Sequence, residues 1–285
     1  MFFFIGIVIV IGSILGGYMP HGNVTVLLQP LEFLIILGSA IGAFIISNPK
    51  PILSGTGKQL PRIFKGPPHD QASYLELLTL LYSLFKLIRT KGLLAIESHI
   101  ENPEESTLFA NYPSFLKNHH GVEFLCDYLR LMTMGTENPN VLEDLMNEEI
   151  ETHHKEAHGV SAAVGALGEA LPAFGIVAAV LGVIVTMSHI DEPPEILGGM
   201  IGGALVGTFF GILVSYGVVT PMSKNLENYA ELDGKYYECL KAGLLAHLQG
   251  CAPAVSVEFA RKVLASHERP SFIELEDAVQ NVLPV

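Results

Sequence analysis

Four apolar stretches, each long enough to cross a lipid bilayer as a helix, constrain this chain more than any other feature. They comprise residues 2–19, 30–47, 170–187 and 196–220, and Glu32 is the one charged residue within them. About 20 apolar residues span the hydrocarbon core as a helix, so all four qualify as membrane spans. The sequence therefore predicts a membrane protein with four transmembrane helices.

The four apolar stretches also have other interpretations. Any one of the four could be a buried core helix, and 2–19 could be a cleaved signal peptide. The first stretch lacks a basic segment and a small-residue cleavage site, which favours a span. Composition agrees, because only 16% of the 285 residues are charged and soluble proteins carry about 25%.

The basic residues predict the orientation of the spans. Loops 20–29 and 188–195 contain no Lys or Arg, whereas 48–169 holds ten and 221–285 holds the other six. The side of the membrane with Lys and Arg is normally the cytoplasm. We therefore expect both termini in the cytoplasm, with the three cysteines reduced.

Hydrophobic periodicity indicates helices throughout the cytoplasmic parts, and no alternating strand pattern persists. The predicted class is all-α, with spans in 2–47 and 170–220, a cytoplasmic helical domain in 48–169 and cytoplasmic helices in 221–285. The last helix has Ser271 as its N-cap and Glu274 completing a capping box. The other cytoplasmic helices are expected at 71–89, 104–118, 121–134, 138–158, 222–249 and 253–267.

Several function classes are disfavoured. A net charge of −13 is opposite to what nucleic-acid binding needs. The Ser54–Lys58 string resembles a phosphate loop, but Ile52 replaces its first glycine and Gln59 follows the lysine. No nucleophile–base arrangement has a recognisable context, so we expect neither an enzyme nor a cofactor.

Histidines at 154 and 158 have the i, i+4 spacing of zinc ligands but lack the remainder of an H-E-x-x-H motif. A solvated helix face is the default interpretation of this pair, and we predict no metal site.

Glycines recur every four residues in the last span, at Gly199, Gly203, Gly207 and Gly211, and Ser215 extends the series. Small residues let membrane helices approach closely. Packing within one subunit and contact between subunits around a shared pore both remain open.

The spans contain no central ionisable residue of the kind that marks ion transport. Glu32 lies at the outer edge, where a solvated side chain is the simplest expectation. Pro172 and Pro221 stand at the cytoplasmic ends of the last two spans, where proline can kink a helix. If the chain conducts protons, the carboxylate must come from another chain. The polar residues inside these spans are mainly Thr186, Thr208 and Ser215.

Six runs spread along the chain are distinctive. They are IENPEES from Ile100, EEIETH from Glu148, LPAFGIVAAVLG from Leu171, VGTFFGIL from Val206, VEFARK from Val257 and ERPSFIELE from Glu268. In this order they resemble the MotA family of flagellar stator subunits over nearly the whole chain. The resemblance implies a bacterial inner-membrane complex with MotB, whose transmembrane helix carries the proton-accepting aspartate, and torque on the rotor protein FliG.

The resemblance also implies roles for single residues. Pro172 and Pro221 match prolines that couple ion flow to movement, and Thr208 matches a threonine beside the partner's aspartate. Sodium-driven relatives carry threonine seven residues after the first proline, where this chain has Ala179, so the conducted ion is expected to be a proton. Thr186 is included in the ion path as an interior polar residue.

Arg89 and Glu97 match the charged pair that contacts FliG, and Glu149 lies in an acidic run near a second rotor-facing region. A continuous helix would place Arg89 and Glu97 roughly on one face, although Gly92 could bend it. The resemblance further implies a homo-oligomeric ring of five chains around two MotB helices. The alternatives are an ExbB- or TolQ-like energiser, with three spans, and a membrane scaffold or receptor.

Overall fold

The computed structural model describes residues 2–136 and 138–282, and within these ranges it contains helices and no strand. The expected all-α class is confirmed. Three helical segments are long and apolar enough to cross a membrane, and the first helix, α1, is apolar but shorter. The chain divides into two compact units, Met1–Gly66 with Glu156–Ala230 (unit 1) and Pro67–Lys155 with Glu231–Val285 (unit 2).

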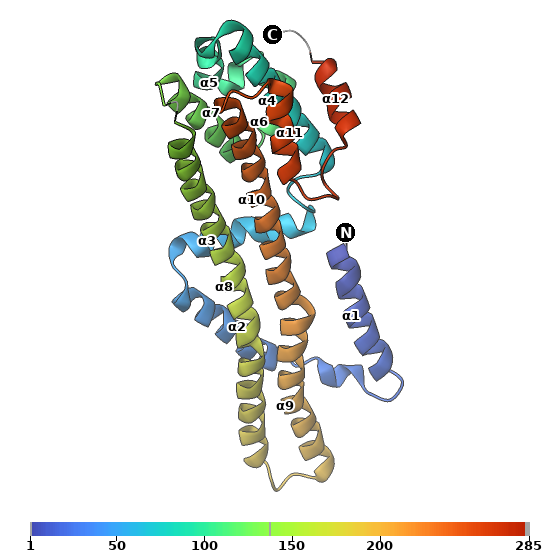
Figure 1. Cartoon of the computed structure of the whole chain (residues 1–285). Coiled ribbons are helices and arrows are strands. Elements are labelled where there is room, and N and C mark those ends of the chain that lie inside the picture. The colour runs from blue at the N-terminus through green and yellow to red at the C-terminus, as the bar shows by residue number, and fades with distance from the viewer. Residues whose placement is uncertain (1, 137, 283–285) are drawn as a thin grey trace. The chain divides into compact units, whose positions relative to one another are not determined.

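Unit 1 holds the apolar helices. Its long elements α8 and α9 run side by side in opposite directions, joined by the loop at 188–193 (Figure 1). Both α8 and α10 contribute to both units. The elements are α1 (Phe2–Tyr18), η1 (Val24–Leu27), α2 (Pro30–Ser47), α3 (Lys50–Gln59), η2 (Leu60–Phe64), α8 (Pro139–Met187), α9 (Pro194–Val214), η6 (Ser215–Val219) and α10 (Thr220–Leu248).

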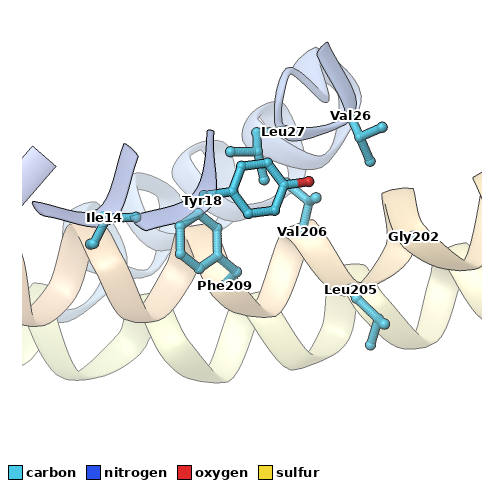
Figure 2. Close-up of a pocket in the computed structure, with 8 residues that line it drawn as sticks. All are labelled: Ile14, Tyr18, Val26, Leu27, Gly202, Leu205, Val206 and Phe209. Carbon is cyan, nitrogen blue, oxygen red and sulfur yellow. The ribbon is translucent and has the colours of Figure 1, made fainter. Parts of the chain in front are cut away.

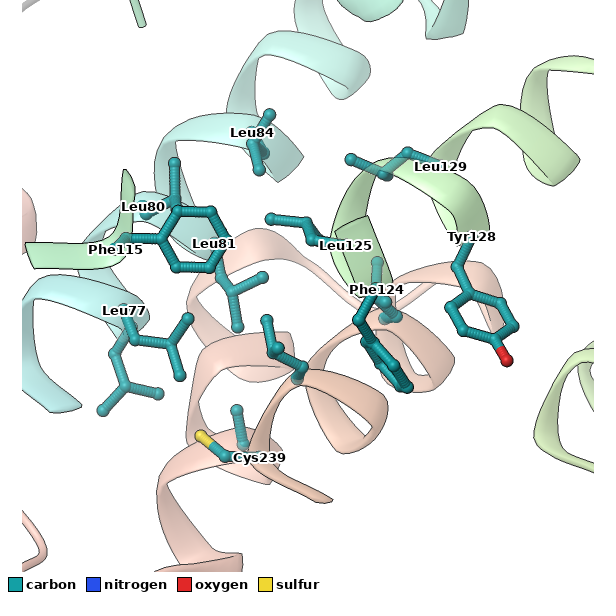
Figure 3. Packing of buried hydrophobic residues seen from close by; sticks show 14 of the residues in the cluster. Leu77, Leu80, Leu81, Leu84, Phe115, Phe124, Leu125, Tyr128, Leu129 and Cys239 are labelled. Atoms are coloured by element: carbon teal, nitrogen blue, oxygen red, sulfur yellow. The ribbon is translucent and has the colours of Figure 1, made fainter. Parts of the chain in front are cut away.

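Unit 2 surrounds α4 (Gln71–Lys91), which begins at a capping box on Asp70. Helices α11 and α12 pack on α4, so it is buried more widely than an amphipathic surface helix would be. Figure 3 shows Leu77, Leu81 and Leu84 of α4 close to Phe124 and Leu125 of α7 in this core. The remaining elements are η3 (Leu93–Ile96), α5 (Glu97–Glu101), η4 (Pro103–Glu105), η5 (Phe109–Asn111), α6 (Pro113–Leu116), α7 (His119–Thr133), α11 (Pro253–Val263) and α12 (Phe272–Gln280).

The helix prediction was wrong in two places. Residues 138–158 and the third span form one helix, α8, which continues through Pro172. The segment 104–118 instead forms short helical turns before and after Tyr112, because the backbone leaves the helical conformation at Ser106 and again at Tyr112. The capping box at Ser271 is confirmed, with Ser271 Oγ accepting from the Glu274 N–H at 3.2 Å.

Candidate ion path and coupling site

Glycines allow α8 and α9 to pack backbone against backbone. A methyl group built on Gly211 would lie 2.6 Å from the Leu171 carbonyl oxygen, and one on Gly175 would lie 3.0 Å from the Gly207 carbonyl oxygen. Neither position has room for a side chain unless the helices separate. At this contact the glycine series therefore packs helices within one chain.

The outer part of the series behaves differently. Gly203 faces the Gln29 side chain, whereas nothing lies within 4 Å of a methyl group built on Gly199. The subunit-contact interpretation therefore remains open for Gly199 alone.

Two of the predicted ion-path residues lie at the close contact. Thr208 is half-buried and its Oγ1 donates to the Gly175 carbonyl oxygen over 3.4 Å, a long and weak hydrogen bond. Ala179 is half-buried on the facing stretch of α8, and its nitrogen lies 3.5 Å from a methyl group built on Gly207. The structure thus brings Thr208 and Ala179 to one helix contact.

The third predicted residue, Thr186, lies farther along α8 and is buried. Its hydroxyl donates to the Gly182 carbonyl oxygen of its own helix at 2.8 Å. The proton of this hydroxyl is therefore engaged locally.

Glu32 lies against the same pair of helices. Its Oε2 is buried without a hydrogen-bond partner and lies 3.2 Å from a methyl group built on Gly207; its Oε1 lies 3.5 Å from one on Gly182. The expectation of a simply solvated Glu32 was wrong, because the glycines leave a slot that encloses one oxygen. An enclosed carboxylate without a partner in a membrane bundle is a functional candidate.

Pro172 lies inside α8 and has no backbone N–H to donate to Gly168, four residues earlier. The Ser215 hydroxyl fills this place, donating to the Gly168 carbonyl oxygen at 2.6 Å, and Ser215 is 1% exposed. A buried serine of the neighbouring helical segment therefore satisfies the carbonyl that proline leaves open.

Pro221 stands directly after a π-turn. The Thr220 N–H donates to the Ser215 carbonyl oxygen, five residues earlier. Such a turn accommodates the missing donor and the ring of a following proline without breaking the helix. Both predicted hinge prolines therefore lie at irregular helix sites, and Ser215 belongs to both.

Hydroxyl groups connect α8 to the helical stretch formed by α9, η6 and α10 at regular intervals. We call these two stretches the helical rods. Ser223 Oγ donates to the Ser161 carbonyl oxygen at 2.8 Å, in addition to the bonds made by Thr208 and Ser215. The three acceptors on α8, Ser161, Gly168 and Gly175, are seven residues apart. The donors Thr208 and Ser215 are also seven residues apart, whereas the π-turn lengthens the interval from Ser215 to Ser223 to eight. The turn thus keeps the donors facing α8.

The predicted rotor residues do not share one helix. Arg89 is exposed near the end of α4, and Gly92 ends that helix with a φ of 85° before Glu97 opens α5. Glu97 is also exposed. The continuous helix that would place Arg89 and Glu97 on one face does not form, because Gly92 adopts a left-handed conformation.

Arg89 has an electrostatic neighbour in His247. Burial and then the positive charge of Arg89 lower the pKa of His247, whose ring stacks on Phe85 at 4.4 Å. His247 is therefore neutral at neutral pH and adds no second positive charge beside Arg89.

Glu149 is exposed on α8 and accepts a hydrogen bond from the Tyr128 hydroxyl at 2.7 Å. Burial, followed by this bond to a carboxylate, raises the pKa of Tyr128. Tyr128 therefore remains a donor and orients Glu149.

An apolar cavity of about 350 Å³ lies between α1, η1 and α9, and neither Thr208 nor the two prolines line it. Figure 2 shows the Tyr18 hydroxyl as the polar tip among apolar side chains such as Ile14 and Phe209. This lining has no group suited to ion transfer. Within the described residues, no cluster of three or more His, Cys, Asp or Glu could hold a metal ion.

Comparison with known proteins identifies the class. The family of the Motility protein A N-terminal region matches residues 4–92, and the MotA/TolQ/ExbB proton channel family matches residues 117–238. Together with the apolar helices, these matches define the chain as a multi-pass membrane subunit of the proton-channel class.

Motility protein A of Escherichia coli (strain K12) is 44% identical over 283 residues, covering 99% of this chain and 96% of that protein. The flagellar MotAB stator complex of Bacillus subtilis is similar in structure, with a TM-score of 0.70, 28% identity and coverage of 90% and 92%. C. jejuni MotAB, at 22% identity and a TM-score of 0.78, covers 95% of this chain and 98% of its own and supports the fold. The chain belongs to the motility protein A family. It is a flagellar stator subunit, and the ExbB- or TolQ-like alternative is not favoured.

Proposed function

We propose that this chain and a MotB-like subunit together form a proton path, and that proton movement along it drives torque on the rotor. One observation carries the proposal. The facing membrane segments of α8 and α9 contain Gly, Ala and Thr at their contact but no carboxylate. Glu32 of α2 lies beside this pair toward its outer side, so a proton path past Thr208 needs a further acceptor from a partner helix, and the solved relative from B. subtilis is a MotAB complex.

Within this path, Thr208 has the role of orienting water beside the partner's aspartate. Its bond to Gly175 is weak enough to exchange. Glu32 supplies a carboxylate of this chain's own toward the outer side, between the levels of Thr186 and Thr208. Ala179 offers no side-chain oxygen, which favours protons over sodium, because sodium needs several oxygen ligands.

The proposed assembly is a ring of five chains around two MotB helices in the inner membrane. Each chain crosses four times, with both termini and all 16 basic residues on the cytoplasmic side. The net charge of −13 per chain makes the cytoplasmic part of such a ring strongly acidic.

Arg89, Glu97 and Glu149 are proposed to face charges on FliG. Exchanging the charges in an Arg89→Glu, Glu97→Lys double variant should severely reduce swimming, because both contacts become repulsive. Removing one charge, as in Arg89→Gln, should weaken swimming only mildly, since an exposed pair contributes under about 1 kcal/mol. The measurement is swimming speed at equal stator abundance, and normal swimming of the double variant would contradict the assignment.

A further inference from the structure

The segment formed by α3 and η2 is basic within an acidic chain. No Asp or Glu occurs between Glu32 and Asp70, although the chain as a whole has a net charge of −13. All the basic side chains of the segment and of the residue that follows it are exposed. They are Lys50, Lys58, Arg62 and Lys65.

These cations differ from others on the surface, because none of them forms an ion pair with a described residue. By contrast, Lys155 pairs with Glu151 at 2.6 Å, Lys224 with Glu227 at 2.7 Å and Lys235 with Glu238 at 2.8 Å. The positive charge of the α3–η2 segment is thus available to a partner outside the chain.

The apolar side of the segment anchors it to the helical rods. Ile63 packs with Val160 and Val164 of α8 and Leu226 of α10, and Ile52 and Leu60 border the same cluster. The packing is close, since a methyl group on Gly55 would lie 2.9 Å from Val160. In Figure 1 the α3–η2 segment runs across α8 and α10 instead of along them.

The segment also lies beside the ends of two apolar helices. It follows α2 after Ser47 with only two residues between them, and Phe64 packs on Phe3 and Phe4 at the start of α1, with centroids 5.8 and 5.1 Å apart. A segment that crosses the rods where membrane helices end lies in the plane of the bilayer surface.

We propose that the α3–η2 segment binds the phosphate groups of anionic lipids at the membrane surface. A basic residue near an anionic leaflet strengthens association about fivefold, and here the cations have no competing carboxylate nearby in sequence. The inference goes beyond the stator role and rests on the proposed membrane spans. A soluble anion is the alternative occupant, and the test separates it from a lipid.

The test reconstitutes the full-length chain in phosphatidylcholine vesicles with spin-labelled phosphatidylglycerol or spin-labelled phosphatidylcholine. Electron paramagnetic resonance measures the lipid immobilised by the protein. The natural chain should prefer phosphatidylglycerol at least about fivefold, and a Lys58→Gln, Arg62→Gln, Lys65→Gln variant should lose most of this preference. High salt should weaken the preference of the natural chain as well.

The matched control is Lys155→Gln, Lys224→Gln, Lys235→Gln, which removes the same charge from paired positions and should keep the preference. The proposal is overturned if the natural chain shows no preference, if the control loses as much as the test variant, or if the preference persists in high salt. Competition by inorganic phosphate would indicate a soluble-anion site instead. Because swimming is not measured, the result is independent of the stator function.

Discussion

Replacing Gly211 with valine is expected to abolish swimming by preventing α8 and α9 from packing. A methyl group at this position would lie 2.6 Å from the Leu171 carbonyl oxygen and near Gly175 Cα at 3.2 Å. Both neighbours are backbone atoms, so no side-chain rotation relieves the clash. Overpacking of a tight contact costs about 1–3 kcal/mol or more, and the helices must separate at the proposed ion path.

The measurement is swimming together with the amount of chain that co-purifies with its MotB-like partner. Gly199→Val is the comparison variant, because nothing lies within 4 Å of that position. It should assemble and swim if Gly199 has no neighbour in the complex, and its failure would assign Gly199 to a subunit contact. Normal assembly and swimming of Gly211→Val would contradict the packing described for α8 and α9.

Replacing either Pro172 or Pro221 with leucine is expected to leave assembly intact and remove most torque. Leucine at 172 restores an N–H that faces the Gly168 carbonyl. This N–H competes with the 2.6 Å bond from Ser215, and α8 becomes straighter without the proline ring. Leucine at 221 removes the reason for the π-turn at Ser215–Val219. Both changes therefore act on the same junction between the rods.

The readouts are stator abundance in the membrane, proton flux and the speed of a tethered cell. Ser215→Ala is the matched control for the shared bond, and it should reduce speed less than either proline variant because both prolines remain. A proline variant that is missing from the membrane would make that residue structural, and full speed would exclude a hinge.

The helical class and most of the cytoplasmic helices were predictable because their signals are local. Ser271, for example, does not depend on distant residues to cap its helix. The burial of Glu32 was not predictable, since the slot for its carboxyl group is made by Gly182 and Gly207, which lie on two helices far from Glu32 in the sequence. No pattern in the separate spans indicates which glycines face a carboxylate.

Other misses came from local signals that tertiary packing overrides. Pro172 was expected at the cytoplasmic end of a span separate from the helix at 138–158, yet α8 continues through it, and Ser215 satisfies the open carbonyl of Gly168. No helix was predicted for the string around Gly55 and Gly57, but it is helical in α3, where Gly55 fits against Val160. Gly92 was a correct warning that the helix carrying Arg89 does not reach Glu97.

The most direct test of the central claim is swimming of cells that carry only this stator, with sodium removed and the proton gradient kept. Ala179 offers no side-chain oxygen beside Thr208, so the path should serve protons, and a proton crossing about 100 mV releases about 2.3 kcal/mol for each torque step. We expect full swimming speed without sodium and loss of swimming when the proton gradient is collapsed. Swimming that stops without sodium and returns in proportion to added sodium would contradict the proton path.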